Sequence, residues 1–190
     1  SLLIGITGAT RSGKSTLSKD ACEQLNEVCN CRVSCEVIQQ DFHRNFETIW
    51  VEHGGAWMVD WESPERCDWD SFLISIEEAA ARSRVVIVEG YCILHDDRVR
   101  GILDRIVWVD IDKATCLMRR ETWPDGWPSK GAYFDSCIWP AHKRYESNVF
   151  GESEASKEPP VLRVCGTHSP EKLRDGLVEQ ICTWVAEQDS

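Results

Sequence analysis

The sequence predicts an α/β protein in which a parallel five-stranded sheet lies between two layers of helices. Short apolar runs alternate with helical stretches along the 190 residues, a pattern typical of a parallel sheet covered on both faces. The run Val85-Val86-Ile87-Val88 is apolar at every position, as expected of a fully buried strand. A glycine-rich turn joins the first strand to the first helix, which places a ligand site at the carboxyl edge of the sheet.

The first strand and the first helix flank a phosphate-binding pattern. Residues 2–7 are a short apolar run, and the helix that follows has an apolar face made by Leu17, Ala21, Leu25 and Val28. The residues between them fit G-x-x-x-x-G-K-[ST], the phosphate-binding loop of nucleotide-binding proteins. We expect its backbone N–H groups to bind a polyphosphate, with Lys14 at the terminal phosphates and Ser15 on Mg²⁺. The expected nucleotide-binding residues here are Gly8, Ala9, Thr10, Arg11, Ser12, Gly13, Lys14, Ser15 and Thr16.

The remaining elements follow in order. Strands are expected at 32–38, 85–88, 106–111 and 161–164, and helices at about 64–83, 112–121, 136–149 and 170–187. The last helix has a capping Ser169 followed by Pro170, and its buried face is expected to be Leu173, Leu177, Ile181 and Trp184. Residues 42–63 and 123–135 are predicted to be irregular loops over the carboxyl ends of the strands, and 150–160 a surface connection.

Composition narrows the possible partners. The net charge of −11 argues against duplex DNA or an anionic membrane as a partner, and no apolar run approaches 18 residues. We therefore expect one domain spanning residues 1–190, monomeric or weakly homodimeric, that binds a small molecule and neither nucleic acid nor membrane.

Ten cysteines are compatible with a secreted disulfide framework or with reduced thiols in a cytoplasmic enzyme. The second is favoured because the chain opens directly with a strand and the cysteine spacing is irregular. Cys29 and Cys31 form a C-x-C without a matching pair, which supports a zinc site only weakly. We expect Cys92, Cys116 and Cys165 to be small core residues.

Two acids follow strands beside the phosphate-binding loop. Asp41 comes after the second strand, where a carboxylate could accept the proton of an attacking hydroxyl or orient a metal-bound water. The alternative is a solvated loop acid. Glu89 follows the fully apolar strand and matches the acid that holds Mg²⁺ in such proteins, the alternative being a structural ion pair.

Arginines and tryptophans mark two further features. Arg119 and Arg120 precede a proline- and glycine-rich stretch, and we expect a lid at about 119–135 that brings an arginine to the phosphates; the alternative is an exposed basic helix end. The sequence has nine tryptophans, and those in the two irregular stretches could stack on a flat base, with cation–π attraction if the base is a pyridinium. These are Trp50, Trp57, Trp61, Trp123 and Trp127.

Three segments together resemble the nicotinamide riboside kinases, a family close to the uridine kinases. They are residues 5–17 around the phosphate-binding loop, residues 87–94, and the block Gly131-Ala132-Tyr133-Phe134-Asp135-Ser136-Cys137-Ile138-Trp139-Pro140 with Tyr145 beyond it. The last block is similar to the family's G-Y-F-D-x-x-x-W-P segment and is not a general feature of phosphate-binding loops. The resemblance implies a three-layer P-loop fold with a lid loop.

The resemblance also implies a reaction and a set of roles. The family transfers the γ-phosphate of ATP to the 5′-hydroxyl of nicotinamide riboside, with Mg²⁺. By position, Asp41 resembles the acid beside the acceptor hydroxyl, Trp61 the ring that stacks on nicotinamide, and Glu62 the acid that binds the ribose hydroxyls. Arg120 resembles the arginine on the ribose. The nucleotide roles fall on Lys14, Ser15, Glu89, Gly166 and Thr167, the last two as the adenine turn. Arg119 stays a candidate for the nucleotide from its position at the start of the lid.

Several alternatives stay open. The family has two consecutive acids where this chain has Asp41 followed by Phe42, so Gln40 is the other candidate for the catalytic position. Trp123 or Trp127 could supply a second stacking ring. The acceptor could be uridine, cytidine or another small hydroxyl compound, and a nucleotide-binding regulatory protein with little catalysis is the third hypothesis. ATP and GTP are both open as donors.

Overall fold

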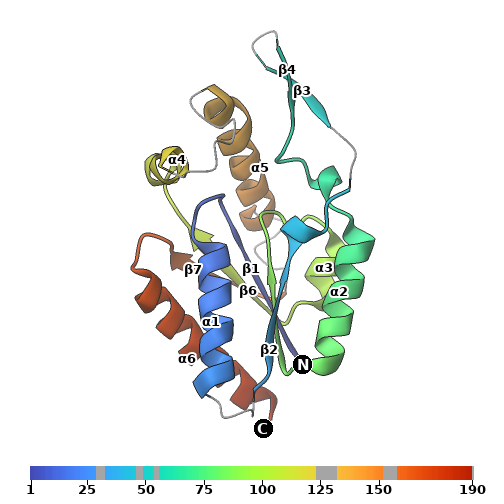
Figure 1. Ribbon diagram of the computed structural model, residues 1–190, viewed down its shortest axis with the longest axis vertical. Helices are drawn as coiled ribbons and strands as arrows, with labels where there is room; N and C mark the ends of the chain where they lie inside the picture. The colour runs from blue at the N-terminus through green and yellow to red at the C-terminus, as the bar shows by residue number, and fades with distance from the viewer. Residues whose placement is uncertain (29–32, 46–48, 54–55, 123–131, 152–157, 190) are drawn as a thin grey trace.

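A computed structural model describes residues 1–28, 33–45, 49–53, 56–122, 132–151 and 158–189. Five parallel strands form one sheet in the order β2-β5-β1-β6-β7 (Figure 1). The strands are β1 (Leu2–Gly8), β2 (Cys35–Gln39), β5 (Val85–Glu89), β6 (Arg105–Asp110) and β7 (Val161–Cys165). The predicted parallel sheet of five strands is thereby confirmed, and its order places β1, which carries the phosphate-binding loop, at the centre.

Helices cover both faces of this sheet (Figure 1). One core cluster packs the sheet against α1 (Lys14–Val28) and α6 (Pro170–Gln188). A second cluster packs the opposite face against α2 (Trp69–Arg82), α3 (Asp97–Ile102) and α5 (Trp139–Phe150). The predicted apolar face of α6 is confirmed, with Leu177, Ile181 and Trp184 buried and Leu173 partly buried.

Strand β5 shows why the layers form. Val85 and Ile87 point into the first cluster and Val86 and Val88 into the second, each with no exposed surface. Side chains alternate across a strand, so a strand that is apolar at every position must be covered on both sides. Each such side chain contributes about 1.5–3 kcal/mol when it leaves water.

A third, smaller cluster lies beyond the carboxyl edge of the sheet. It joins the phosphate-binding loop to α4 (Lys113–Glu121) and to the π-helical turn η3 (Phe134–Ile138) that precedes α5. Pro140 lies within this continuous helical stretch. A proline there has no N–H for the carbonyl one turn back and its ring clashes with that carbonyl, which accounts for the wider turn.

Three local features differ from the sequence-based expectations. Residues 42–63 are not wholly irregular, because they contain the antiparallel hairpin of β3 (Trp50–His53) and β4 (Ala56–Val59), which projects from the sheet edge in Figure 1. The expected helix 64–83 is split into the 3-10 turn η2 (Pro64–Arg66) and α2. Helix α3 was not predicted, since its six residues are too few to display a helical repeat.

The cysteines follow the expectation with one exception. Every cysteine in the described ranges is a free thiol, and Cys92 and Cys116 are buried. Cys165 is exposed, so its prediction as a core residue is wrong: it ends the edge strand β7, which is only partly covered. Cys29 and Cys31 lie outside the described residues. Over the same ranges, no helix combines the length and the apolar character that a bilayer crossing demands.

Candidate functional site

The phosphate-binding loop has the backbone that its glycines permit. Gly8 and Gly13 adopt φ of 137° and 101°, and Arg11 a φ of 58°. A Cβ added to Gly8 would lie 2.4 Å from the carbonyl oxygen of Val109, so only glycine fits between the loop and β6. The chain turns sharply here and enters α1 with its first-turn N–H groups facing the loop, which is the arrangement that binds phosphates.

Two polar side chains of this loop, Lys14 and Ser12, are buried. Buried Lys14 donates from Nζ to the carbonyl oxygen of Ala9, 2.9 Å away. The Ser12 hydroxyl is buried and has no hydrogen-bond partner among the described residues. Ser15 and Thr16 are exposed at the start of α1. A phosphate group would satisfy both the ammonium and the orphaned hydroxyl, so the loop fits the group that the motif predicts.

Other residues predicted to bind the nucleotide meet the same loop. Arg119 donates to the carbonyl oxygens of Arg11 at 3.2 Å and Ser12 at 3.4 Å, and to that of Gly166 at 3.0 Å. A Cβ on Gly166 would lie 2.7 Å from the Ser12 carbonyl oxygen, so the turn after β7 packs directly on the loop. Thr167 follows in that turn, its hydroxyl 3.0 Å from the Cys165 thiol.

The register of the sheet brings the two predicted acids to one edge. Glu89 is level with Ile6 of β1 and with Gln39 of β2. The residues that follow these three positions therefore emerge side by side at the carboxyl ends of adjacent strands. Asp41 lies in the 3-10 turn η1 (Gln40–Phe42), directly after β2.

The environments of the acids differ. Glu89 is buried and accepts a hydrogen bond from the Gln39 amide at 3.0 Å. The Asp41 side chain is 79% exposed, and its carboxylate pairs with Arg44 at 2.7 Å. Gln40, the other candidate, is buried with its amide committed to the backbone N–H and the thiol of Cys92, both at 3.1 Å. Asp41 is thus the more accessible group.

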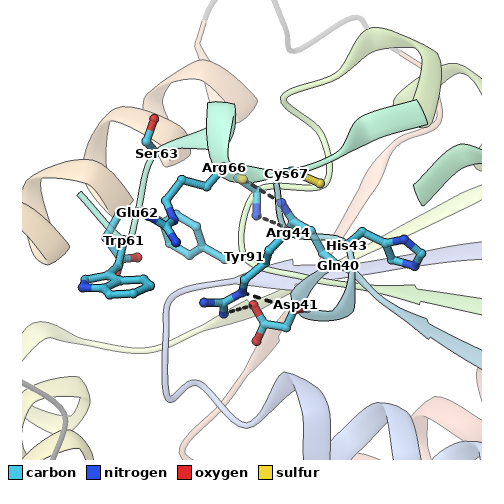
Figure 2. Close-up of a pocket in the computed structure, with 11 residues that line it drawn as sticks. Gln40, Asp41, His43, Arg44, Trp61, Glu62, Ser63, Arg66, Cys67 and Tyr91 are labelled. Atoms are coloured by element: carbon cyan, nitrogen blue, oxygen red, sulfur yellow. Dashed lines mark hydrogen bonds and ion pairs between the residues drawn. The ribbon is translucent and has the colours of Figure 1, made fainter. Parts of the chain in front are cut away.

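A partly open pocket lies beside Asp41. Figure 2 shows Asp41 and Arg44 at one border and Trp61 and Glu62 at another, with Arg66 and Tyr91 between them. The lining residues are Gln40, Asp41, His43, Arg44, Trp61, Glu62, Ser63, Arg66, Cys67, Tyr91 and Cys92. Three predicted acceptor residues, Asp41, Trp61 and Glu62, are therefore brought together.

Glu62 has a perturbed carboxyl. Burial raises its pKa from 4.5 to about 7, opposed by the positive charge of Arg120; Asp60 and Asp41 favour the rise and Lys14 opposes it. The residue also donates its backbone N–H to the Asp60 carboxylate at 3.0 Å. Glu62 therefore lies within electrostatic reach of both the phosphate loop and the acid after β2.

Trp61 is held from two sides. The Tyr133 hydroxyl donates to the Val59 carbonyl at 3.1 Å and accepts from the Trp61 backbone N–H at 3.2 Å. The Trp61 side chain packs partly against the third core cluster, and the Arg66 guanidinium carbon lies 4.2 Å from the centre of its ring. A residue of the 131–140 block thus fixes the segment that carries the proposed stacking ring.

Arg120 joins the acceptor side to the loop. Its guanidinium donates to the Thr10 hydroxyl at 3.0 Å, and its charge acts on Glu62. The remaining predicted acceptor residues, Trp123 and Trp127, lie outside the described residues, as does most of the predicted lid.

Sequence reasoning did not single out Arg44, Arg66 or Tyr91. Arg66 is five residues after Trp61 in the sequence. It reaches the Trp61 ring because the η2 turn, which begins at Pro64, folds the chain back on itself. Pro64 after the polar Ser63 indicates a turn in the sequence. It does not indicate that Arg66 will contact the ring of Trp61. Tyr91 follows Glu89 by two residues and lines the pocket, where Figure 2 shows it between Glu62 and Asp41.

Fold and site together define a P-loop α/β phosphotransferase: a phosphate loop and a small-molecule pocket share the carboxyl edge of one parallel sheet. Comparison with known proteins agrees with this class. Human nicotinamide riboside kinase 1 is 27% identical to the chain over 199 residues, covering 98% of this chain and 94% of that protein. Mouse nicotinamide riboside kinase 2 is 24% identical, covering 95% of each.

A uridine kinase of Clostridium botulinum is 29% identical over 141 residues, covering 63% of this chain and 66% of that protein. The resemblance predicted from the motifs is confirmed: the chain is similar to the nicotinamide riboside kinases and the uridine kinases. The predicted class of enzyme, a phosphotransferase with an alcohol acceptor, is confirmed as well.

Solved structures show the same fold. A gluconokinase from Sinorhizobium meliloti 1021 matches with a TM-score of 0.57 at 16% identity, covering 98% of this chain and 95% of that one. A sugar kinase from Janibacter sp. HTCC2649 matches with a TM-score of 0.53 at 14% identity and the same coverage. No protein-family model matches the chain.

Proposed function

We propose that this protein transfers the γ-phosphate of ATP to the 5′-hydroxyl of a pyridine riboside, with nicotinamide riboside giving nicotinamide mononucleotide for NAD salvage. The observation that carries the proposal is the pocket in which Asp41, Trp61 and Glu62 meet, with the charge of Lys14 acting on Glu62. The similarity to nicotinamide riboside kinases over nearly the whole chain supports the choice of acceptor. We further propose that residues 1–190 act as one domain, with 119–135 as its lid.

Each group has a stated task in this proposal. Asp41 accepts the proton of the acceptor hydroxyl, and its exposed carboxylate is free to approach a bound sugar once Arg44 moves aside. Glu62 and Arg120 bind the ribose hydroxyls, and Trp61 stacks on the base. Lys14 and Arg119 hold the nucleotide at the loop. Catalysis then rests mainly on positioning and on neutralising charge.

The residues present also fit Mg²⁺. In the ranges that the structure describes, no three His, Cys, Asp or Glu side chains gather as a metal cage. Mg²⁺ needs no such cage, because it commonly binds one or two protein oxygens together with phosphates and water. The exposed Ser15 hydroxyl, Glu89 and Asp41 would hold it between loop and acceptor. When bound, the ion neutralises charge on the phosphates.

The test is ADP formation from ATP and Mg²⁺, with and without added acceptor. We expect ADP that depends on nicotinamide riboside and a phosphorylated riboside as product. A panel of uridine, cytidine and small sugars measures the alternative acceptors suggested by the uridine kinase similarity. Tight ATP binding without acceptor-dependent ADP would favour the regulatory alternative and contradict the proposal.

A further inference from the structure

Arg66 forms no ion pair with any of the residues that the structure describes, although it lines the acceptor pocket. It lies over the Trp61 ring and lines the pocket with it. Its Nη1 is buried and makes no hydrogen bond to any described residue. The other arginine of the pocket, Arg44, is already neutralised by Asp41 at 2.7 Å. Nor is Arg66 among the charges that act most strongly on Glu62.

The Trp61 ring compensates part of the solvation that this half-buried guanidinium loses, but its buried Nη1 donor has no acceptor among the described residues. Such a donor is satisfied when a ligand brings an oxyanion, and arginine binds a carboxylate through two parallel hydrogen bonds. A ligand that has a net positive charge and no oxyanion meets like charge at Arg66 instead.

We propose that Arg66 determines acceptor specificity: the site selects ribosides whose positive ring carries a carboxylate over those whose base has a net positive charge. The inference rests on the proposed riboside kinase function and names the preferred class within it. A carboxylate on the pyridine ring gives a neutral zwitterion that can pair with Arg66. A carboxamide leaves a cation that cannot, although the two ligands are nearly identical in shape.

The experiment compares nicotinamide riboside with the riboside in which a carboxylate replaces the carboxamide. For the unmodified protein we expect kcat/KM to favour the carboxylate, by roughly 10- to 100-fold, the range of one charged hydrogen-bonded pair. In R66Q this ratio falls to near one or reverses, whereas R66K retains part of it. Arg174→Gln removes the same charge from α6, where Arg174 pairs with Asp175, and leaves the ratio unchanged.

Two results would overturn the inference: an unmodified protein that prefers the amide, or a ratio that R66Q does not alter. If neither riboside is phosphorylated, the proposed function fails separately, and equilibrium binding of the two ribosides decides the role of Arg66. Tighter binding of the carboxylate, lost in R66Q, then supports it. Equal binding, or none, contradicts it. Circular dichroism of R66Q and R66K confirms that both variants fold.

Discussion

Glu62 links the acceptor pocket to the pH dependence of stability. Its pKa rises from 4.5 to about 7 because burial disfavours the charged carboxylate. The folded state therefore binds this proton more tightly than the unfolded state does. Ionisation of Glu62 therefore lowers the free energy of unfolding. This loss of stability is absent well below pH 4.5, grows as the pH rises from 4.5 to about 7, and reaches its full size above about pH 7.

The size of the effect follows from the shift. The ionised carboxyl costs about 3 kcal/mol of folding free energy at pH 8 and about 1 kcal/mol at pH 5. Glu62→Gln carries no titrating charge, so its stability relative to the unmodified protein should rise by about 2 kcal/mol between pH 5 and pH 8. Urea unfolding of the nucleotide-free protein at both pH values measures this difference.

Glu65 provides the control, because it is three residues away and exposed, and its pKa is lowered rather than raised, chiefly by the Ser63 hydroxyl. Glu65→Gln should show no gain in relative stability over the same interval. If the relative stability of Glu62→Gln is the same at pH 5 and pH 8, burial does not penalise this carboxylate and the reasoning is wrong.

Three further changes test the site. Asp41→Asn should lower kcat by about 10²- to 10⁴-fold with ATP affinity retained, as shown by steady-state kinetics and nucleotide titration. Gly8→Ala should cost more than about 2 kcal/mol and abolish nucleotide binding, because φ is 137° and the new methyl meets the Val109 carbonyl. Tyr133→Phe should cost about 1–3 kcal/mol and raise the acceptor KM while the ATP KM stays constant.

Each of these has a matched control. Asp70 is as exposed as Asp41 and pairs with Arg98 at the same 2.7 Å, so Asp70→Asn should keep full activity. Gly101→Ala meets no atom within 4 Å and should fold normally. The buried Tyr91 hydroxyl has no hydrogen-bond partner among the described residues, so Tyr91→Phe should not reduce stability. Equal effects in a variant and its control would contradict the corresponding role.

The sheet and the phosphate loop could be predicted from the sequence because each depends on a pattern of neighbouring residues. The first four residues of strand β5, 85–88, are all apolar, and the loop's glycines and lysine have fixed spacing. The hairpin β3–β4 escaped prediction because its strands are four residues each and pair with each other outside the main sheet. The run Ala56–Val59 is apolar, but four residues are too few for periodicity to distinguish a strand from a loop.

Contacts between distant segments could not be read from the sequence. The resemblance assigned a stacking role to Trp61, but not the Tyr133 hydroxyl that holds its backbone from 72 residues away. The environment of Gln40 was equally hidden, since its amide meets Cys92 only once β2 and β5 are aligned.

The three carbonyls bound by Arg119 belong to two parts of the chain that are more than a hundred residues apart. Grafting the turn at Gly166 from another kinase would thus require the arginine to come with it. In the same way, a chimera joined between α4 and β7 would take Arg119 from one parent and the Gly166 turn from the other. The hydrogen bond between them would then depend on two segments that do not come from the same protein.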